Sequence, residues 1–177
     1  VRCCTQNGVR GGSATVHFPI WHQEIEDILV LKNNKGTEDN RVRKLDYSIQ
    51  ISKLFYERFI KNTDISLFSP NHVPGLYEAF GMPEFDELYV KYEKDKSIPK
   101  STIGAQELFM DLLKERAETG RIYIMNLDHC NTHSSFKDKV YMSNLCQEIT
   151  LPTTPVQHID DKEGEIALCI LSAINLG

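Results

Sequence analysis

The 177-residue sequence lacks any long hydrophobic run: its apolar stretches, such as Ile28-Leu29-Val30-Leu31, are only a few residues long. A membrane-spanning helix needs roughly 20 apolar residues. The sequence also lacks an excess of basic residues, with 20 Lys and Arg against 25 Asp and Glu and a net charge of -5. Because nucleic-acid affinity depends on a basic face, we expect neither a membrane nor a nucleic-acid polymer as partner. The polar, glycine-rich start carries no secretory signal, which favours a cytoplasmic protein.

Cysteines are few and odd in number, and they are spread along the chain: Cys3, Cys4, Cys130, Cys146 and Cys169. Small disulfide-stapled domains instead carry a dense, even set. A reducing compartment is therefore expected. The first residue is Val1 and not Met, which suggests a piece of a larger protein.

Hydrophobic residues make up 41% and charged residues 25% of the chain, as in ordinary globular domains. The spacing of apolar residues predicts strands over 14–18, 45–51, 65–68, 121–125, 145–151 and 166–171. It predicts helices over 20–32, 53–61, 85–94 and 102–118. Strands that alternate with helices of ten or more residues favour an α/β fold with a largely parallel sheet or barrel. With no convincing linker, the chain is expected to form one continuous domain portion.

The run from Ser143 to Ile149 carries the most chemistry. In an extended strand Asn144, Cys146 and Glu148 would share one face. An amide, a thiol and a carboxylate on one face are suited to holding a polar ligand beside a reactive sulfur. A straight strand would separate Asn144 and Glu148 by about 13 Å, so this reading requires the segment to bend. The alternative is an edge strand with a solvated polar face and a buried, inert cysteine.

Cys169 lies in the apolar stretch Gly164 to Cys169. Cysteine is among the most buried residue types. Taken alone, Cys169 is therefore expected to be a small core residue.

The segment from His129 to His133 places Cys130 between histidines. It lacks the second ligand pair of a zinc site, and a cysteine-hydrolase nucleophile at Cys130 is conceivable from residue types alone. A turn whose Asn, Thr and His side chains satisfy backbone groups is the favoured reading. The glycine-rich run from Gly8 to Ser13 lacks the spacing of a P-loop or dinucleotide fingerprint, and as a pattern it predicts only a flexible loop.

Longer stretches carry a family resemblance. They are Gln6-Asn7-Gly8-Val9-Arg10-Gly11-Gly12, Leu29-Val30-Leu31-Lys32-Asn33-Asn34, Leu67-Phe68-Ser69-Pro70, Val73-Pro74-Gly75-Leu76-Tyr77, Thr119-Gly120-Arg121-Ile122-Tyr123, Asp128-His129-Cys130-Asn131-Thr132-His133-Ser134, Ser143-Asn144-Leu145-Cys146 and Gly164-Glu165-Ile166-Ala167-Leu168-Cys169. In this order they resemble the large, catalytic subunit of class I ribonucleotide reductase, most like the bacterial and phage class Ia enzymes. The resemblance runs over 1–177. It implies reduction of ribonucleoside diphosphates by a thiyl-radical mechanism, in a ten-stranded α/β barrel with the catalytic cysteine on a central finger loop.

The resemblance also implies roles for individual residues. Cys146 matches the thiol that becomes a thiyl radical and removes the 3′ hydrogen of the ribose. Glu148 matches the general base for the 3′-hydroxyl, and Asn144 matches the amide that positions the ribose, with Leu145 beside them in the substrate site. Cys169 matches one cysteine of the redox disulfide, whose partner lies outside the chain. Gln147 stands where the family usually has leucine.

Cys4 through Ser13 match the specificity loop between an effector-nucleotide site and the substrate base, with Cys4, Gln6 and Arg10 as its effector-loop residues. The resemblance implies ATP and deoxynucleotide effectors for the full subunit and no cofactor or metal bound by this segment. The implied partners are a radical-generating small (beta) subunit with a metal-radical cofactor, a second large subunit, and thioredoxin or glutaredoxin.

The family's other redox cysteine, its radical-transfer tyrosines and its C-terminal cysteine pair have no counterparts in the chain. We therefore expect 1–177 to be a portion of the barrel domain, incomplete at both ends and inactive by itself. The alternative is an inert nucleotide-binding remnant of the same fold.

Overall fold

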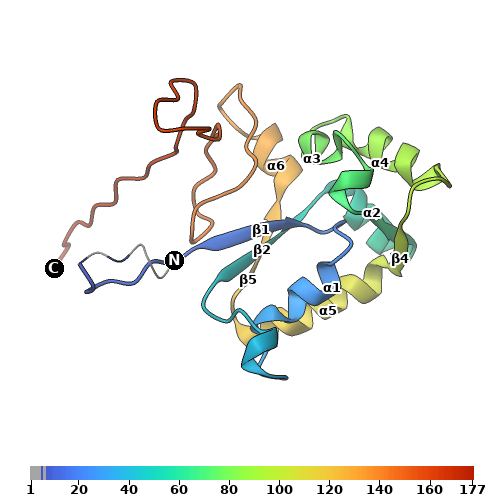
Figure 1. Cartoon of the computed structure of the whole chain (residues 1–177), viewed down its shortest axis with the longest axis horizontal. Coiled ribbons are helices and arrows are strands. Elements are labelled where there is room, and N and C mark those ends of the chain that lie inside the picture. Colours follow the sequence, from blue (N-terminus) through green and yellow to red (C-terminus); the bar gives the residue numbers. More distant parts are fainter. Residues whose placement is uncertain (1–4, 6) are drawn as a thin grey trace.

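The computed structural model describes residues 5 and 7–177. Its centre is a parallel sheet of strands β1 (Thr15–Pro19), β2 (Asp46–Ile51) and β5 (Ile122–Asn126), in the spatial order β1-β2-β5 (Figure 1). The register aligns His17 with Ser48 and Ser48 with Tyr123. The expected α/β class and parallel pairing are confirmed.

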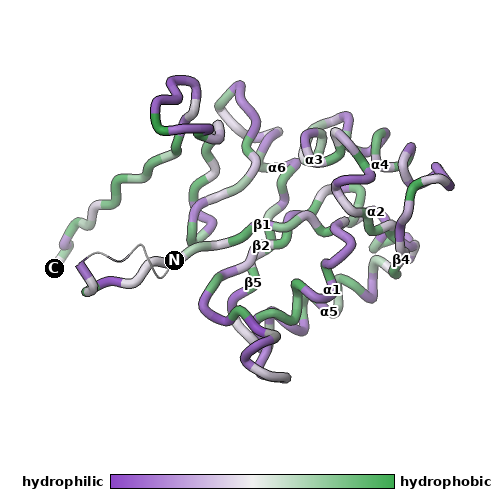
Figure 2. The backbone as a smooth tube through the Cα atoms, in the orientation of Figure 1, coloured by the Kyte–Doolittle hydropathy of each residue, from purple (hydrophilic) through white to green (hydrophobic). Residues whose placement is uncertain are grey.

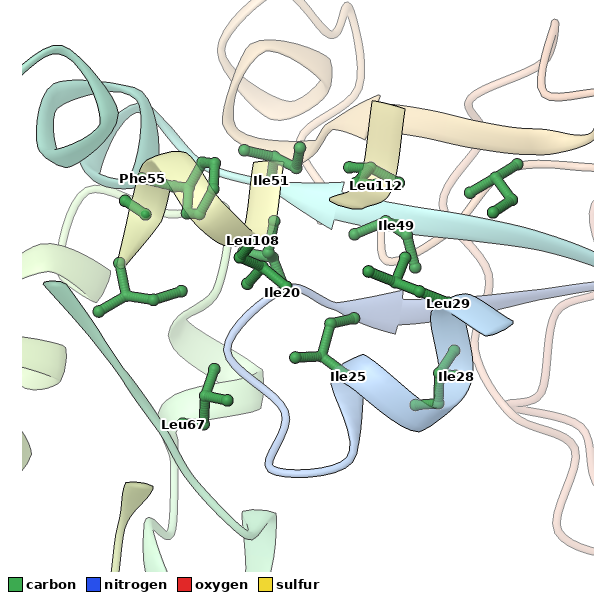
Figure 3. Close-up of a cluster of buried hydrophobic side chains, with 13 residues drawn as sticks. Ile20, Ile25, Ile28, Leu29, Ile49, Ile51, Phe55, Leu67, Leu108 and Leu112 are labelled. Atoms are coloured by element: carbon green, nitrogen blue, oxygen red, sulfur yellow. The ribbon is translucent and has the colours of Figure 1, made fainter. Parts of the chain in front are cut away.

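One face of this sheet is covered by helices α1 (Ile25–Leu29), α2 (Lys53–Lys61) and α5 (Ala105–Thr119). The core between sheet and helices is mainly aliphatic, with Phe55 among its members, as the close-up in Figure 3 shows. Its buried members include Ile20, Ile25, Leu29, Ile49, Ile51, Phe55, Leu108, Leu112 and Ile122. In register, Ile49 aligns with Phe18 and Ile124, so every second strand residue serves this core.

A second group of elements packs beyond the carboxyl ends of the strands. Strands β3 (Asp64–Leu67) and β4 (Ser101–Gly104) form an antiparallel pair. Helices α3 (Leu76–Ala79), α4 (Phe85–Lys94) and α6 (Leu127–Thr132) lie in this part of the molecule (Figure 1). Their buried side chains contribute to a core rich in aromatic residues. Its buried members include Trp21, Phe68, Phe80, Phe85, Tyr89, Met125 and Val140. Short 3₁₀ turns η1 (Val30–Lys32), η2 (Glu38–Asn40) and η3 (Pro70–His72) complete the elements.

Two helix predictions are confirmed with their bounds, 53–61 and 85–94, and two are corrected. The helix expected over 20–32 begins only at Ile25, because Ile20 donates to Gln50 O and extends the sheet. Residues 21–23 then pair with Phe68. The helix expected over 102–118 begins at Ala105, because residues 101–104 pair with β3.

Two strand predictions are wrong. Residues 145–151 form a turn followed by irregular chain, because Asn144 and Ile149 pair with each other and not with a neighbouring strand. Residues 166–171 form no ladder with any described strand, and the nearest pairing is an isolated bridge between Thr154 and Glu165. A segment with the apolar residues of a strand forms one only where a neighbouring strand is available for hydrogen bonding.

The carboxyl-terminal segment leaves the body of the molecule as an extended trace rich in hydrophobic residues (Figures 1 and 2). Its exposed apolar residues are Ile166, Leu168, Ile170, Leu171, Ile174 and Leu176. Throughout the part of the chain that the structure describes, no helix has the length and apolar character needed to cross a membrane.

Candidate active site

The segment that carries Asn144, Cys146 and Glu148 is a closed turn. The backbone N–H of Asn144 donates to Ile149 O (3.4 Å), and Ile149 N donates back to Asn144 Oδ1 (3.0 Å). Gln147 N donates to Asn144 O (3.2 Å), and Ser143 Oγ also donates to Ile149 O. These bonds bring the two ends of the segment together, which confirms the bend that the distance argument required.

The tip of this turn is fixed to the sheet face that lies opposite α1 and α5. Thr15 Oγ1 of β1 donates to Leu145 O (2.6 Å). Ser48 Oγ of β2 donates to Gln147 Oε1 (2.5 Å), and Gln147 Nε2 donates to Ile124 O of β5 (2.7 Å). Gln50 Nε2 of β2 donates to Tyr141 O at the base of the segment (2.5 Å). All three parallel strands therefore hold the turn.

Cys146 lies at the tip of this turn as an exposed, free thiol. Glu148 is exposed as well, and Asn144 is half-buried because its side-chain oxygen closes the turn. Cys146 is therefore neither buried nor part of an edge strand, which corrects the alternative interpretation of this segment on both points. Residues on each side of Cys146 contact the sheet, which leaves the sulfur free to meet a ligand.

Cys169 approaches the same turn from the carboxyl-terminal segment. A pocket of about 160 Å³ is lined by residues of both segments: Met142, Ser143, Asn144, Ile149, Leu151, Thr153, Ala167, Leu168 and Cys169. Cys169 is exposed and free, so the expectation of a core cysteine is wrong. The structure thus brings Cys169 and Asn144 to one pocket, although they are 25 residues apart (169 − 144).

The sheet residues that hold the turn carry no recognisable motif in the sequence. Ser48 and Gln50 are fully buried, with 0% exposure, although polar residues in an alternating strand usually indicate a solvated face. His17 lies on the same face, next to the backbone of Ser143. Burial lowers the pKa of His17, although the backbone hydrogen bond with Ser143 opposes this shift. In the sequence, these residues are marked only by the alternation of polar and apolar side chains along their strands.

The segment 129–133 belongs mostly to helix α6, which corrects the expected turn. Its polar side chains do satisfy backbone groups as predicted, since Thr132 Oγ1 donates to Asp128 O (2.9 Å) and Asn131 Nδ2 to Leu127 O (3.0 Å). Burial, reinforced by Asp128, raises the pKa of the Cys130 thiol. A hydrolase nucleophile needs a lowered thiol pKa, and these surroundings shift the pKa of Cys130 in the other direction. Within residues 5 and 7–177, no three His, Cys, Asp or Glu side chains are grouped to hold a metal ion.

The effector-loop residues Cys4 and Gln6 lie outside the described residues. Arg10 is exposed on the loop that leads into β1. Asn7 and Gly8 both have positive φ, 50° and 73°, which agrees with a loop that needs left-handed backbone.

These features define an α/β protein that presents a free thiol on a turn bound to the polar face of a parallel sheet. The family described as "Ribonucleotide reductase, barrel domain" matches residues 1–177. The chain belongs to this family.

Individual relatives agree with this assignment. The chain is 62% identical to the ribonucleoside-diphosphate reductase subunit alpha of Haemophilus influenzae, over all of this chain and 24% of that protein. It is 59% identical to ribonucleoside-diphosphate reductase 1 subunit alpha of Escherichia coli over 88% of this chain. It is 48% identical to the subunit alpha of Enterobacteria phage T4 over 99% of this chain. The chain spans about a quarter of the length of these relatives.

Proposed function

We propose that the chain is a portion of the catalytic barrel of a ribonucleotide reductase large subunit, and that the whole subunit reduces ribonucleoside diphosphates. The observation that carries this proposal is the exposed Cys146 thiol, on a turn that Asn144 closes and three strands hold. Family membership supports the same reading. In this proposal the turn is the finger loop of a ten-stranded barrel, of which β1, β2 and β5 are adjacent strands.

Cys146 is proposed as the radical site. A thiyl radical at its sulfur takes a hydrogen atom from C3′ of the ribose, so that an S–H bond forms as the C3′–H bond breaks. Glu148, exposed beside it, accepts the proton of the 3′-hydroxyl. Asn144 Oδ1 is occupied by Ile149 N, so the Nδ2 donor is the group that we expect to meet a ribose hydroxyl, with Leu145 alongside.

Cys169 is proposed as one thiol of the reducing pair. The 2′-hydroxyl takes up a proton and leaves as water, and a hydrogen replaces it at C2′. Two thiols supply the two electrons and the two hydrogens for this exchange and end as a disulfide. The pocket that Cys169 shares with Asn144 supports this role, because a reductant must reach the ribose that Asn144 holds. The second thiol belongs to the rest of the subunit.

The remaining partners follow from the family and are part of the proposal. A small (beta) subunit with a metal-radical cofactor generates the radical, a second large subunit completes a homodimer, and thioredoxin or glutaredoxin reduces the disulfide. ATP and deoxynucleotides act as effectors through the loop that contains Arg10. We place the protein in the cytoplasm.

The direct test is an assay of the intact large subunit with its small subunit, a dithiol reductant and a ribonucleoside diphosphate. Deoxyribonucleotide formation is expected, and the 177-residue chain alone should give none. Nucleotide binding without turnover by the intact subunit would instead identify the inert remnant and contradict the proposal. Trapping of thiols after one turnover without reductant should find Cys169 in a disulfide, and a free Cys169 thiol would contradict its role.

A further inference from the structure

The two residues that flank Cys146 each contact the sheet, whereas Cys146 itself stays exposed. Leu145 is held through its carbonyl by Thr15 Oγ1 of β1 (2.6 Å). Gln147 is held through its side chain, which lies between β2 and β5. Both residues that flank the thiol are therefore hydrogen-bonded to the sheet.

Gln147 suits its place because its two partners need opposite hydrogen-bonding groups. Ser48 Oγ donates to Oε1 (2.5 Å), and Ile124 O accepts from Nε2 (2.7 Å). A side-chain amide offers an acceptor and a donor together, whereas an ionised carboxylate offers acceptors alone and leucine offers neither. Ser48 is fully buried, so its hydroxyl needs a protein partner.

The backbone of Gln147 is held in the left-handed region, with φ of 64°. Residues other than Gly, Asn and Asp adopt this region rarely, and it persists where surrounding contacts enforce it. The two hydrogen bonds of the Gln147 side chain are such contacts. They fix the turn in a conformation that its backbone does not favour by itself.

We propose that Gln147 is a positioning residue for Cys146, acting with Ser48 and Thr15; this inference rests on the proposed function. Hydrogen-atom transfer requires the sulfur and C3′ to approach within about 3–3.5 Å, and a displacement near 1 Å lowers rates by about a hundredfold. Gln147 touches neither substrate nor the reacting atoms. It sets where the adjacent sulfur lies above the sheet.

The test measures kcat and KM in the intact subunit for Gln147→Leu, Gln147→Gly and Ser48→Ala. Leucine is hydrophobic and removes both hydrogen bonds, and glycine also removes them but accepts the backbone angle without strain. Both substitutions are expected to lower kcat about tenfold to a hundredfold, with KM within about twofold because ribose-binding groups are retained. The double variant Gln147→Leu with Ser48→Ala should be no slower than Gln147→Leu, since the two residues share one interaction. Gln157→Leu, at an exposed loop position, is the matched control.

Two outcomes separate this inference from the proposed function. If Gln147→Gly keeps wild-type kcat while Cys146→Ser abolishes turnover, the backbone alone positions the thiol, and the inference is overturned with the function intact. If Cys146→Ser retains turnover, the proposed function fails instead. Nucleotide binding by each variant verifies folding. Should the Gln147 variants fail to fold, Ser48→Ala decides, because it removes a single hydroxyl, and an unchanged kcat there would overturn the inference.

Discussion

The side-chain amide of Asn131 pairs with both backbone polar groups of Val140. Asn131 Oδ1 accepts from Val140 N (2.8 Å), and Asn131 Nδ2 donates to Val140 O (3.0 Å). The same Nδ2 donates to Leu127 O within α6 (3.0 Å). Since Val140 is fully buried, this pairing fixes the start of the segment that leads to Cys146.

Asn131→Asp is expected to destabilise the protein. It keeps the shape of the side chain but replaces the donor by an oxygen, which faces the carbonyls of Val140 and Leu127. Leaving buried groups unsatisfied costs about 1–3 kcal/mol. Urea denaturation measures the loss, with Asn71→Asp at an exposed position as the control. Equal stabilities of the two variants would contradict the account.

Gly81 makes a close approach to α6. Its φ is 85°, and a Cβ there would lie 2.7 Å from Leu127 Cγ and 3.1 Å from Asn131 Nδ2. Leu127 is buried and has little room to move, so Gly81→Ala combines backbone strain with overpacking. Gly120 has a φ of 69° but open space around it, so Gly120→Ala carries the backbone strain alone. Thermal or urea unfolding should show Gly81→Ala less stable than Gly120→Ala by about 1–3 kcal/mol; no difference would exclude the steric contact.

Glu93 should contribute to acid sensitivity. Burial by itself would raise the pKa of Glu93, but two 2.6 Å hydrogen bonds from Arg58 and one of 3.0 Å from Ser66 outweigh it and hold that pKa below its ordinary value. Because the pKa of Glu93 is lower in the folded protein than in the unfolded chain, where it is about 4.3, its ionisation stabilises the fold above that pH. This stabilisation is lost as the pH falls through the pKa of Glu93 in the folded protein. Glu93→Gln should therefore flatten the fall in unfolding free energy below about pH 4.5. Glu163→Gln, in an exposed loop, should not, and an unchanged profile for Glu93→Gln would refute the assignment.

Lys139 should make the stability of the protein rise with pH in mildly alkaline solution. Its Nζ donates to Glu78 O (2.5 Å) and lies 4.3 Å from the centre of the Tyr141 ring. Burial lowers the pKa of Lys139 to about 8, although the charges of Glu78 and Glu84 oppose this shift. Between about pH 8 and 9.5 the unfolded chain binds more protons, so the unfolding free energy from this group rises with pH. Lys139→Met should make the slope of stability against pH less positive in this window. Lys61→Met, at an exposed helix end, is the control, and identical slopes for the two variants would contradict the prediction.

The parallel sheet could be predicted because half of each strand faces an apolar core. Tyr47, Ile49 and Ile51 alternate in sequence and are all buried, so period-two spacing indicated β2 correctly. Ser48 and Gln50 occupy the alternate positions of this strand, and the segment 141–149 covers them. Strand periodicity indicates which residues share a face of the sheet. It does not indicate whether a later segment of the chain packs on that face.

The turn at Cys146 was expected from the distance between Asn144 and Glu148 in a straight strand and from the family resemblance, but neither indicated which residues hold it. Its hydrogen bonds join residues 99 and 130 positions apart, such as Ser48 to Gln147 and Thr15 to Leu145, and local spacing carries no signal for such contacts. The strand prediction over 166–171 was wrong for a related reason. A strand needs a neighbouring strand to pair with, and none of the described residues provides one for this segment.

The central claim is that Cys146 is the reacting thiol, and it is tested most directly by kcat for ribonucleoside diphosphate reduction in the intact subunit. Cys146→Ser keeps the size of the side chain and removes the sulfur, so it should abolish turnover while nucleotide binding is retained. Cys130→Ser, at a half-buried thiol of α6, is the matched control and should remain active. Turnover by Cys146→Ser at a rate comparable to Cys130→Ser would contradict the account.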